Sequence, residues 1–247
     1  MLKTWEKDRS NPAFNEFYTT KEQCDIIFSD MVPIIYQQND CKPLKVCCPC
    51  DGEQSEIVKY FKLIYPDWEI DYFSDLDFNS EEARARMLKA DVIITNPPFK
   101  MKEWRPFITW LITNKKNFFI WGPLIQSGSF KLLKFIIDNA YIYINKEHKG
   151  NTWMYNLPDG SQKPAITFFY TSYKVPVYEY NYKPIDEPQY YNDIPVYDRR
   201  SNIPPDYTGW MYVPITTLHY LQPFEIDSTK RGVPGKFVRV CVKRRSI

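Results

Sequence analysis

The sequence predicts an α/β protein whose mainly parallel β-sheet is covered by helices on both faces. Short apolar runs of strand length alternate along the chain with segments in which apolar residues recur at helical spacing. This alternation is typical of parallel sheets, and proline or glycine marks the ends of several runs. The expected strands are 44–48, 68–73, 91–95, 117–121, 140–145 and 165–170, and the expected helices are 53–65, 80–90, 104–113 and 131–139.

Two prolines and the spacing of apolar residues predict the first strand and the first helix. The apolar run at 44–48 ends at Pro49, which indicates a short buried strand. A turn at 49–52 follows it. Apolar side chains then recur at helical spacing from Ile57 to Phe61, so we expect an amphipathic helix that ends at Pro66.

The next elements lead to a proline-rich loop. Ser80, followed by two glutamates, is a suitable start for the helix at 80–90. The strand at 91–95 then runs directly into the loop at 96–99. Ligands of such sheets bind at the carboxyl ends of the strands. We therefore expect the turn at 49–52 and the loop at 96–99 to lie at one site.

The composition changes after residue 175. The segment 175–206 is dense in Pro, Tyr and acidic residues without a clear period, which indicates an extended segment that wraps over the rest. Near the end of the chain, 235–245 alternates as a strand does. We expect an α/β domain over 1–175 and a small, irregular C-terminal region over 176–247.

Composition limits the classes of protein to consider. The chain has 247 residues and 44% hydrophobic content, enough for one substantial core and a small appended lobe. Its formal net charge of +2 does not by itself indicate a nucleic-acid-binding protein, so any such surface must be local. Neither a run of about 18 apolar residues nor a signal peptide is visible. We expect a cytoplasmic protein of a prokaryotic or phage-infected cell that does not enter a membrane.

The cysteines indicate neither disulfides nor a metal site. Three of the six cysteines lie within 47–50, too close together for an ordinary disulfide framework. A zinc site would need a second pair of ligands, and the two histidines, His148 and His219, are far away in the sequence. We expect reduced cysteines and no bound metal.

The loop at 96–99, with the sequence Asn-Pro-Pro-Phe, carries the clearest chemical signal. An amino group attached to an aromatic ring is a poor nucleophile, and two hydrogen-bond acceptors aimed at its N–H bonds would direct its lone pair at a methyl donor. The side-chain oxygen of Asn96 and the carbonyl of Pro97 can supply these acceptors. Pro98 keeps the loop stiff, and Phe99 offers a flat face to a flipped-out base. The alternative is a plain turn after a buried strand.

The chain resembles the EcoRI-type adenine-specific DNA methyltransferases, a family of S-adenosylmethionine-dependent amino-methyltransferases. The segment DVIITNPPF at 91–99 fits the catalytic loop of these enzymes after its strand. Further likeness lies in NEFYTT at 15–20, CPCDGEQSEIVKYF at 48–61, WMYVPITTLHYLQPFEI at 210–226 and GKFVRVCVKRR at 235–245.

This resemblance implies a fold and a reaction. The fold would be the Rossmann-like class I methyltransferase fold, with a mainly parallel seven-stranded sheet. The reaction would move the methyl group of S-adenosylmethionine to N6 of an adenine flipped out of a specific double-stranded DNA sequence, leaving S-adenosylhomocysteine. Such a monomeric enzyme would serve restriction-modification or the self-protection of a phage or plasmid.

The resemblance also implies the cofactor residues. Cys48 stands where an acid is common in the family, so Asp51 would contact the cofactor's ammonium group. An acid beyond the second strand would hold the ribose, although Asp77 could instead be a turn residue. The segment 18–20 would close over the cofactor, or else form a strand or a helix cap. The full set is Tyr18, Thr19, Thr20, Cys48, Pro49, Cys50, Asp51, Gly52, Phe73, Asp75, Asp77, Phe78 and Asn96.

Basic residues are the candidates for DNA contact, because lysine and arginine neutralise phosphates. Two aromatic residues join them, since related enzymes place a second aromatic ring against the flipped base. The alternatives are a solvated edge strand and ordinary core packing. The candidates are Lys146, Lys149, Trp153, Tyr155, Lys236, Arg239, Lys243, Arg244 and Arg245.

Other functions stay open from the sequence. Cytosine N4, an RNA adenine and a glutamine side chain in a protein all present an NH₂ group, and the loop at 96–99 cannot distinguish them. A protein that binds nucleic acid without catalysis is the alternative from another class.

Overall fold

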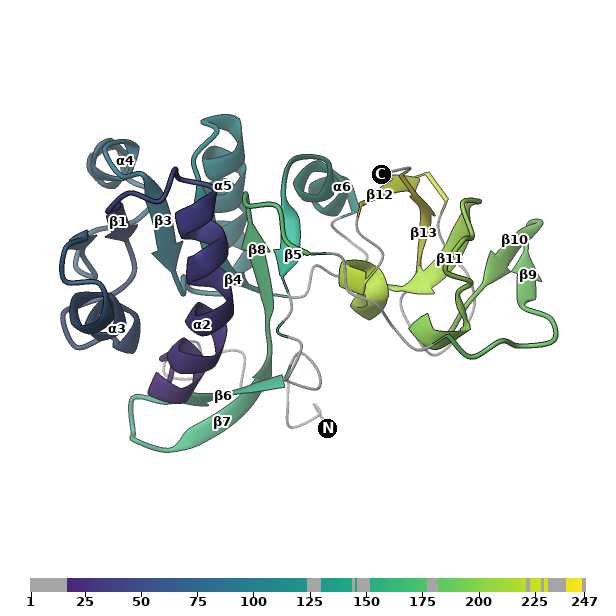
Figure 1. The fold of residues 1–247 in the computed structure, drawn as a ribbon, viewed down its shortest axis with the longest axis horizontal. Coiled ribbons are helices and arrows are strands. Elements are labelled where there is room, and N and C mark those ends of the chain that lie inside the picture. Colours follow the sequence, from purple (N-terminus) through teal and green to yellow (C-terminus); the bar gives the residue numbers. More distant parts are fainter. Residues whose placement is uncertain are drawn as a thin grey trace. The chain divides into compact units, whose positions relative to one another are not determined.

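The computed structural model describes residues 17–123, 130–143, 145, 152–176, 182–220, 223–227, 229–230 and 239–245. The chain divides into two compact units, shown in Figure 1. The first unit draws on residues 1–123 and 143–174, and the second on 124–142 and 175–247.

Five strands of the first unit, together with β5, whose last residue belongs to this unit, form a six-stranded sheet with the order β2-β1-β3-β4-β8-β5. The pairs β1–β2, β1–β3 and β3–β4 are parallel, whereas β8 runs antiparallel to β4. Both strands that lead into the expected ligand loops are therefore in the parallel part. The strands are β1 (Lys45–Cys48), β2 (Glu69–Tyr72), β3 (Val92–Thr95), β4 (Phe118–Gly122), β5 (Tyr141–Tyr143) and β8 (Phe168–Thr171).

The α/β class is confirmed, but seven strands are not found in this sheet among the described residues. Between β2 and β3 the chain forms only a loop and one helix, and β2 is the edge strand of the sheet as far as the structure describes it. The strand expected at 165–170 is divided. Its first residues lie in β7 (Gln162–Ile166), which pairs with β6 (Thr152–Asn156) in a separate hairpin, and its last residues lie in β8.

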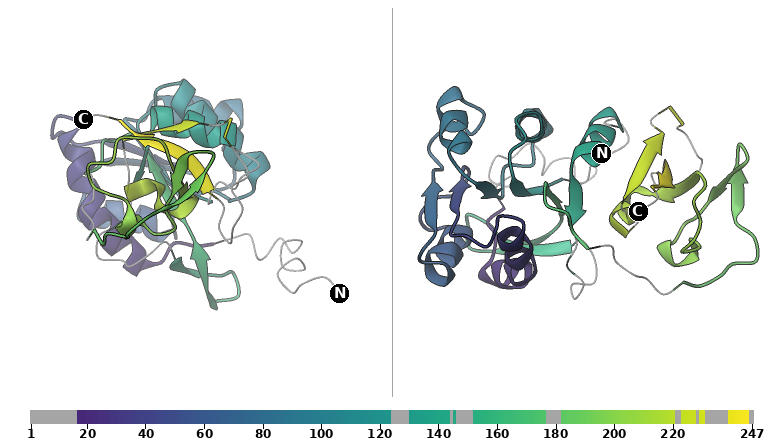
Figure 2. Two further views of the ribbon diagram at one scale, coloured as in Figure 1. Left: turned by 90° about the vertical axis from the view of Figure 1, so that its right-hand side faces the viewer. Right: turned by 45° about the horizontal axis from the view of Figure 1, so that its top comes forward.

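Helices cover both faces of this sheet (Figure 2). Helices α2 (Lys21–Gln37) and α3 (Glu56–Ile64) lie on one face, and α4 (Glu81–Leu88) and α5 (Met101–Thr113) lie on the other. The sequence analysis did not assign α2. Its start has a capping box, in which the Thr20 hydroxyl accepts from the Gln23 backbone and the Gln23 side chain accepts from the Thr20 backbone.

Aromatic side chains form much of the core between this sheet and α2. The Phe119 ring stacks on Phe169 with centroids 5.7 Å apart, and Trp121 meets the Phe169 ring edge-on at 5.3 Å. Phe28 of α2 packs on Phe61 of α3 at 4.8 Å. All five side chains are buried, so the high aromatic content serves the core as well as any ligand site.

The second unit contains a five-stranded sheet with the order β12-β13-β11-β10-β9. The expectation of an irregular C-terminal region is therefore wrong. In its Tyr/Pro-rich part, Asn192 and Asp193 both have positive φ angles and join β9 to β10 as a two-residue hairpin turn. The elements of this unit are α6 (Phe130–Asn139), β9 (Gln189–Tyr191), β10 (Ile194–Val196), η3 (Arg200–Asn202), β11 (Met211–Pro214), η4 (Ile215–Tyr220), β12 (Phe224–Asp227) and β13 (Arg239–Arg244).

Candidate active site

A cavity of about 760 Å³ opens in the first unit at the carboxyl ends of β1, β2 and β3. This is the edge at which a doubly wound sheet binds its ligands. The turn after β1 and the loop after β3 both line it, as the sequence predicts. The lining residues come from 17–19, 49–52, 54–56, 96–99, Ser74, Leu76, Phe78 and Asn156.

The side chain of Asn96 is oriented by the N-terminal segment. Its amide nitrogen donates to the backbone carbonyl of Phe17 at 2.6 Å and to the hydroxyl of Thr19 at 3.1 Å. A carbonyl oxygen can only accept, so the NH₂ end of the amide must face Phe17. The oxygen of the Asn96 amide accepts no hydrogen bond from the part of the chain that the structure describes, and it remains available to a ligand.

A buried carboxylate, Asp51, lies between the two loops. One of its oxygens accepts from the Ser55 hydroxyl and the other from the Thr95 hydroxyl, each at 2.7 Å. Burial raises the pKa of the Asp51 carboxyl to about 6, and the hydrogen bonds from Ser55, Thr95 and the Asn96 backbone oppose that rise. The Asp51 side chain thereby connects the turn after β1 with the end of β3, where the loop at 96–99 begins.

Aromatic rings lie beside the loop after β3. The Phe99 ring stacks on Phe17 with centroids 6.2 Å apart and planes 22° apart. Phe17 in turn meets the Tyr155 ring edge-on at 5.5 Å. Tyr155 is fully buried and donates its hydroxyl proton to Thr167 at 2.7 Å. Phe17 and Phe99 thus give the cavity a flat apolar part.

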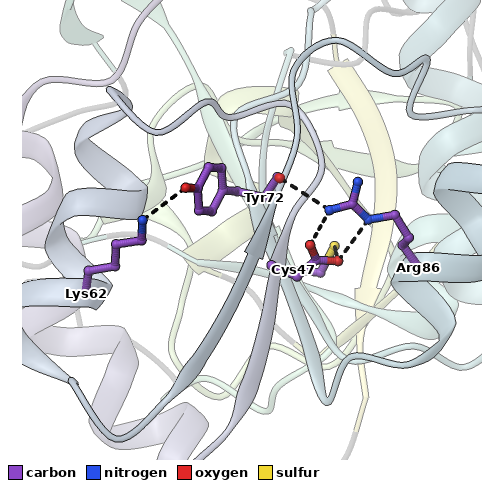
Figure 3. Close-up of polar contacts among 5 residues, drawn as sticks. Cys47, Lys62, Tyr72 and Arg86 are labelled. Atoms are coloured by element: carbon purple, nitrogen blue, oxygen red, sulfur yellow. Dashed lines mark hydrogen bonds and ion pairs between the residues drawn. The ribbon is translucent and has the colours of Figure 1, made fainter.

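The end of β2 is held by Arg86 of α4 (Figure 3). The guanidinium group forms an ion pair with Asp71, lies 3.4 Å from the Tyr72 carbonyl and sits 4.2 Å from the centre of the Phe73 ring. The Lys62 ammonium donates to the Tyr72 hydroxyl at 3.1 Å on the other side of the strand. These contacts fix the start of the segment that carries three cavity residues, Ser74, Leu76 and Phe78.

Most predicted cofactor and catalytic residues line this cavity. They are Tyr18, Thr19, Pro49, Cys50, Asp51, Gly52, Phe78, Asn96, Pro97, Pro98 and Phe99. Their chemical roles stay predictions, but the structure brings them together from four segments of the chain.

The other predicted cofactor residues do not line the cavity. Thr20 caps α2, Cys48 is buried within β1, and Phe73 is buried beneath Arg86. Asp75 and Asp77 are both exposed. The Asp77 carboxylate accepts from the Asn79 backbone at 2.9 Å, the arrangement of a turn residue. The contacts of Asp77 favour this turn alternative.

Several cavity residues were missed by the sequence analysis. They are Phe17, Gln54, Ser55, Glu56, Ser74, Leu76 and Asn156. Ser55 is the N-cap of α3, a role that its place before the apolar periodicity could have indicated. Asn156 reaches the site because its backbone pairs with that of Tyr18, and no local signal predicts this contact between distant segments.

The predicted DNA contacts differ in their surroundings. Trp153 and Tyr155 are 3% and 0% exposed, which disfavours direct contact with DNA and fits the core-packing alternative. Lys146, Lys149 and Lys236 lie outside the described residues.

The arginines of β13 and the residue after it have partners within their own unit. Arg239 forms an ion pair with Asp198, and Arg245 forms one with Asp138 at 2.8 Å. Arg244 donates to the carbonyl of Pro205. Lys243 forms no ion pair with any residue that the structure describes. A role in DNA binding stays a prediction for all four.

Within the described ranges, no group of three or more His, Cys, Asp or Glu side chains is arranged to hold a metal ion. The described helices also include none that is long and apolar enough to cross a membrane.

Comparison with known proteins points to one family. Residues 68–163 match the family described as "Adenine-specific methyltransferase EcoRI". The chain is 28% identical over 213 residues to Type II methyltransferase M.EcoRI of Escherichia coli, covering 71% of this chain and 61% of that relative. It is 27% identical over 233 residues to Type II methyltransferase M.MgeORF184P of Mycoplasma genitalium, covering 69% of this chain and 70% of that relative. These matches confirm the resemblance carried by the motifs: the chain is similar to the EcoRI-type adenine-specific methyltransferases.

Proposed function

We propose that the chain transfers the methyl group of S-adenosylmethionine to N6 of an adenine flipped out of double-stranded DNA. The observation that carries this proposal is the orientation of Asn96. Its amide nitrogen is held by Phe17 and Thr19, its oxygen is left for a ligand, and it lines the cavity together with Pro97.

The cavity suits S-adenosylmethionine in size and in chemistry. About 760 Å³ lies within the range of small-molecule sites, roughly 300–1,000 Å³. Leu76 and Phe78 offer apolar contacts to an adenine ring, and Glu56 offers a carboxylate to an ammonium group. At Gly52, an added Cβ would meet the Ser74 hydroxyl at 3.2 Å, so the absence of a side chain leaves room between these walls. When bound, S-adenosylmethionine supplies a methyl group on a positively charged sulfur.

The residues after β3 would prepare the target amine. The Asn96 oxygen and the Pro97 carbonyl accept its two N–H bonds, which favours a pyramidal nitrogen with a directed lone pair. Phe99, held against Phe17, stacks on the flipped base. The nitrogen would form a bond to the methyl carbon as the carbon–sulfur bond breaks, S-adenosylhomocysteine would leave, and the nitrogen would then release one proton to water. Alignment of the target nitrogen with the methyl group would supply most of the rate enhancement, so a general base is not required.

The choice of DNA adenine draws on the relatives. The matching family is described as adenine-specific, and both relatives are named Type II methyltransferases. The chain spans 61% of the length of M.EcoRI, so the whole activity of that enzyme comes to this chain only as part of the proposal.

The test is methylation of unmethylated genomic DNA with S-adenosylmethionine, followed by digestion to nucleosides and mass spectrometry. We expect a gain of N6-methyldeoxyadenosine with the unaltered chain and at least about 10²-fold slower gain with Asn96→Ala. A gain of N4-methylcytosine would keep the reaction and overturn the choice of base. If no modified base forms although calorimetry detects cofactor binding, the DNA proposal is wrong and RNA or protein amides become the substrates to test.

A further inference from the structure

The strongest unexplained feature of the cavity is its buried carboxylate. Asp51 is only 6% exposed, and each of its carboxylate oxygens accepts a hydrogen bond from a protein hydroxyl group. Thr95, which donates to it at 2.7 Å, is the last residue of β3 and is fully buried. Ser55, which donates at the same distance, begins α3. A backbone N–H from Asn96 also lies close enough to lower the pKa of this carboxyl.

These donors come from the elements that must be aligned for methyl transfer. The Asp51 backbone belongs to the turn after β1, and its N–H donates to the Cys48 carbonyl at 3.3 Å. Its side chain reaches Thr95 and Asn96, at the start of the loop that would hold the target amine. One carboxylate therefore sets the spacing between the cofactor side and the substrate side of the cavity.

A direct role in holding the cofactor is less suited to this side chain. Each of its oxygens already accepts from a protein hydroxyl. Glu56 lines the same cavity and pairs only with Lys59, at 2.9 Å, among the described residues. Its carboxylate is better placed to exchange one cationic partner for a ligand ammonium group.

We infer that Asp51 is a positioning residue for methyl transfer, which fixes the Asn96–Phe99 loop against the first loop through Thr95 and the Asn96 backbone. This inference rests on the proposed function. It replaces the role of Asp51 as a contact of the cofactor ammonium group.

The ionised form of Asp51 is the one that accepts all three donors, because a protonated carboxyl must itself donate. Its surroundings contain few other titratable groups. Burial raises the pKa of the thiols of Cys48 and Cys50 on its own loop well above the usual range, and does the same for Cys24 on α2. Glu56 is the carboxylate from α3, whereas β3 contributes the Thr95 hydroxyl and the residue after it contributes the Asn96 N–H. Activity should therefore rise as the pH increases through about 6.

The test compares Asp51→Asn and Thr95→Val with the unaltered chain. Asparagine keeps the shape but has one acceptor oxygen, and valine removes the hydroxyl donor from a residue that does not line the cavity. Thr171→Val is the matched control, because Thr171 is another fully buried threonine of the same sheet, bonded to the Phe118 carbonyl at 2.9 Å. The readouts are kcat from pH 5 to 8, the Kd of S-adenosylmethionine by calorimetry, and Tm.

We expect both Asp51→Asn and Thr95→Val to lower kcat by about 10²-fold, since a small misplacement of reacting groups has an effect of this size. The cofactor Kd should change by less than about threefold. The rise of kcat near pH 6 should disappear in Asp51→Asn, and Thr171→Val should keep the kcat of the unaltered chain. A large loss of cofactor affinity at unchanged kcat would overturn the inference, as would an unchanged kcat and pH profile in both variants. An unaltered chain that binds the cofactor but methylates no base would instead overturn the proposed function.

Discussion

The amide nitrogen of Asn96 donates a 2.6 Å hydrogen bond to the carbonyl of Phe17, which lies 79 positions earlier in the chain. The Phe17 ring also stacks on Phe99, three positions after Asn96. One N-terminal residue therefore orients the loop after β3 through its backbone and supports it through its side chain. The side-chain geometry of this loop depends on a segment far from it in the sequence.

Replacing Asn96 tests the role of this loop. Asn96→Ala removes the acceptor for the target amine, and we expect turnover to fall by at least about 10²-fold while the cofactor still binds. Nucleoside mass spectrometry measures the first effect and calorimetry the second. Asn114→Ala, at the exposed end of α5, is the matched control and should retain full activity. Normal turnover in Asn96→Ala would rule out the proposed mechanism.

The close approach of Gly52 to Ser74 gives a second prediction. A Cβ at position 52 would lie 3.2 Å from the Ser74 hydroxyl, so Gly52→Ala should narrow the cavity. We expect S-adenosylmethionine affinity to fall by about tenfold, the effect of one misplaced methyl group in a pocket. Adding Ser74→Gly removes the hydroxyl and should restore most of the affinity. If the double variant binds as weakly as Gly52→Ala, this contact is not the cause.

The basic residues of β13 should separate into two kinds. Lys243→Ala should weaken DNA binding and reduce the salt dependence by about 0.9 in the slope of log K against log salt concentration, the value for one phosphate contact. Arg239→Gln should mainly lower stability, by about 1 kcal/mol, because Arg239 is paired with Asp198 within the same unit. Fluorescence anisotropy at several salt concentrations and thermal unfolding distinguish the two. Equal salt slopes for Lys243→Ala and the unaltered chain would show that Lys243 does not contact a DNA phosphate.

The sequence predicted those parts of the site that are adjacent to strong local signals. The turn at 49–52 follows an apolar run that ends at a proline, and the loop at 96–99 follows another apolar run directly. The carboxyl ends of parallel strands lie at one edge of a sheet, so local patterns were enough to predict that Asp51 and Asn96 lie at one site.

The parts that were missed depend on contacts between distant segments. Phe17 and Asn156 reach the cavity because the backbone of Tyr18 pairs with that of Asn156. The sequence predicted that the segment beyond β2 lines the cavity, but it did not predict Ser74 and Leu76 among the lining residues. Asp77 forms a turn, whereas Ser74 lines the cavity, just after Phe73, which packs against Arg86.

The pH dependence of stability should report the burial of Asp51. Its pKa rises from 3.8 to about 6 on folding, so between these values the folded chain holds a proton that the unfolded chain has lost. The free energy of unfolding should therefore fall as the pH rises from about 4 to 6, by on the order of 3 kcal/mol, and should lose no more from this group above pH 6. Asp51→Asn carries no charge at this position and should lack the decline. Urea unfolding of both proteins at pH 4, 5, 6 and 7 measures the difference. If the free energies of unfolding of the two proteins change in parallel with pH, the carboxylate is not buried as described. If the unaltered chain loses stability relative to Asp51→Asn as the pH rises to 7, the charge on Asp51 destabilises the folded chain.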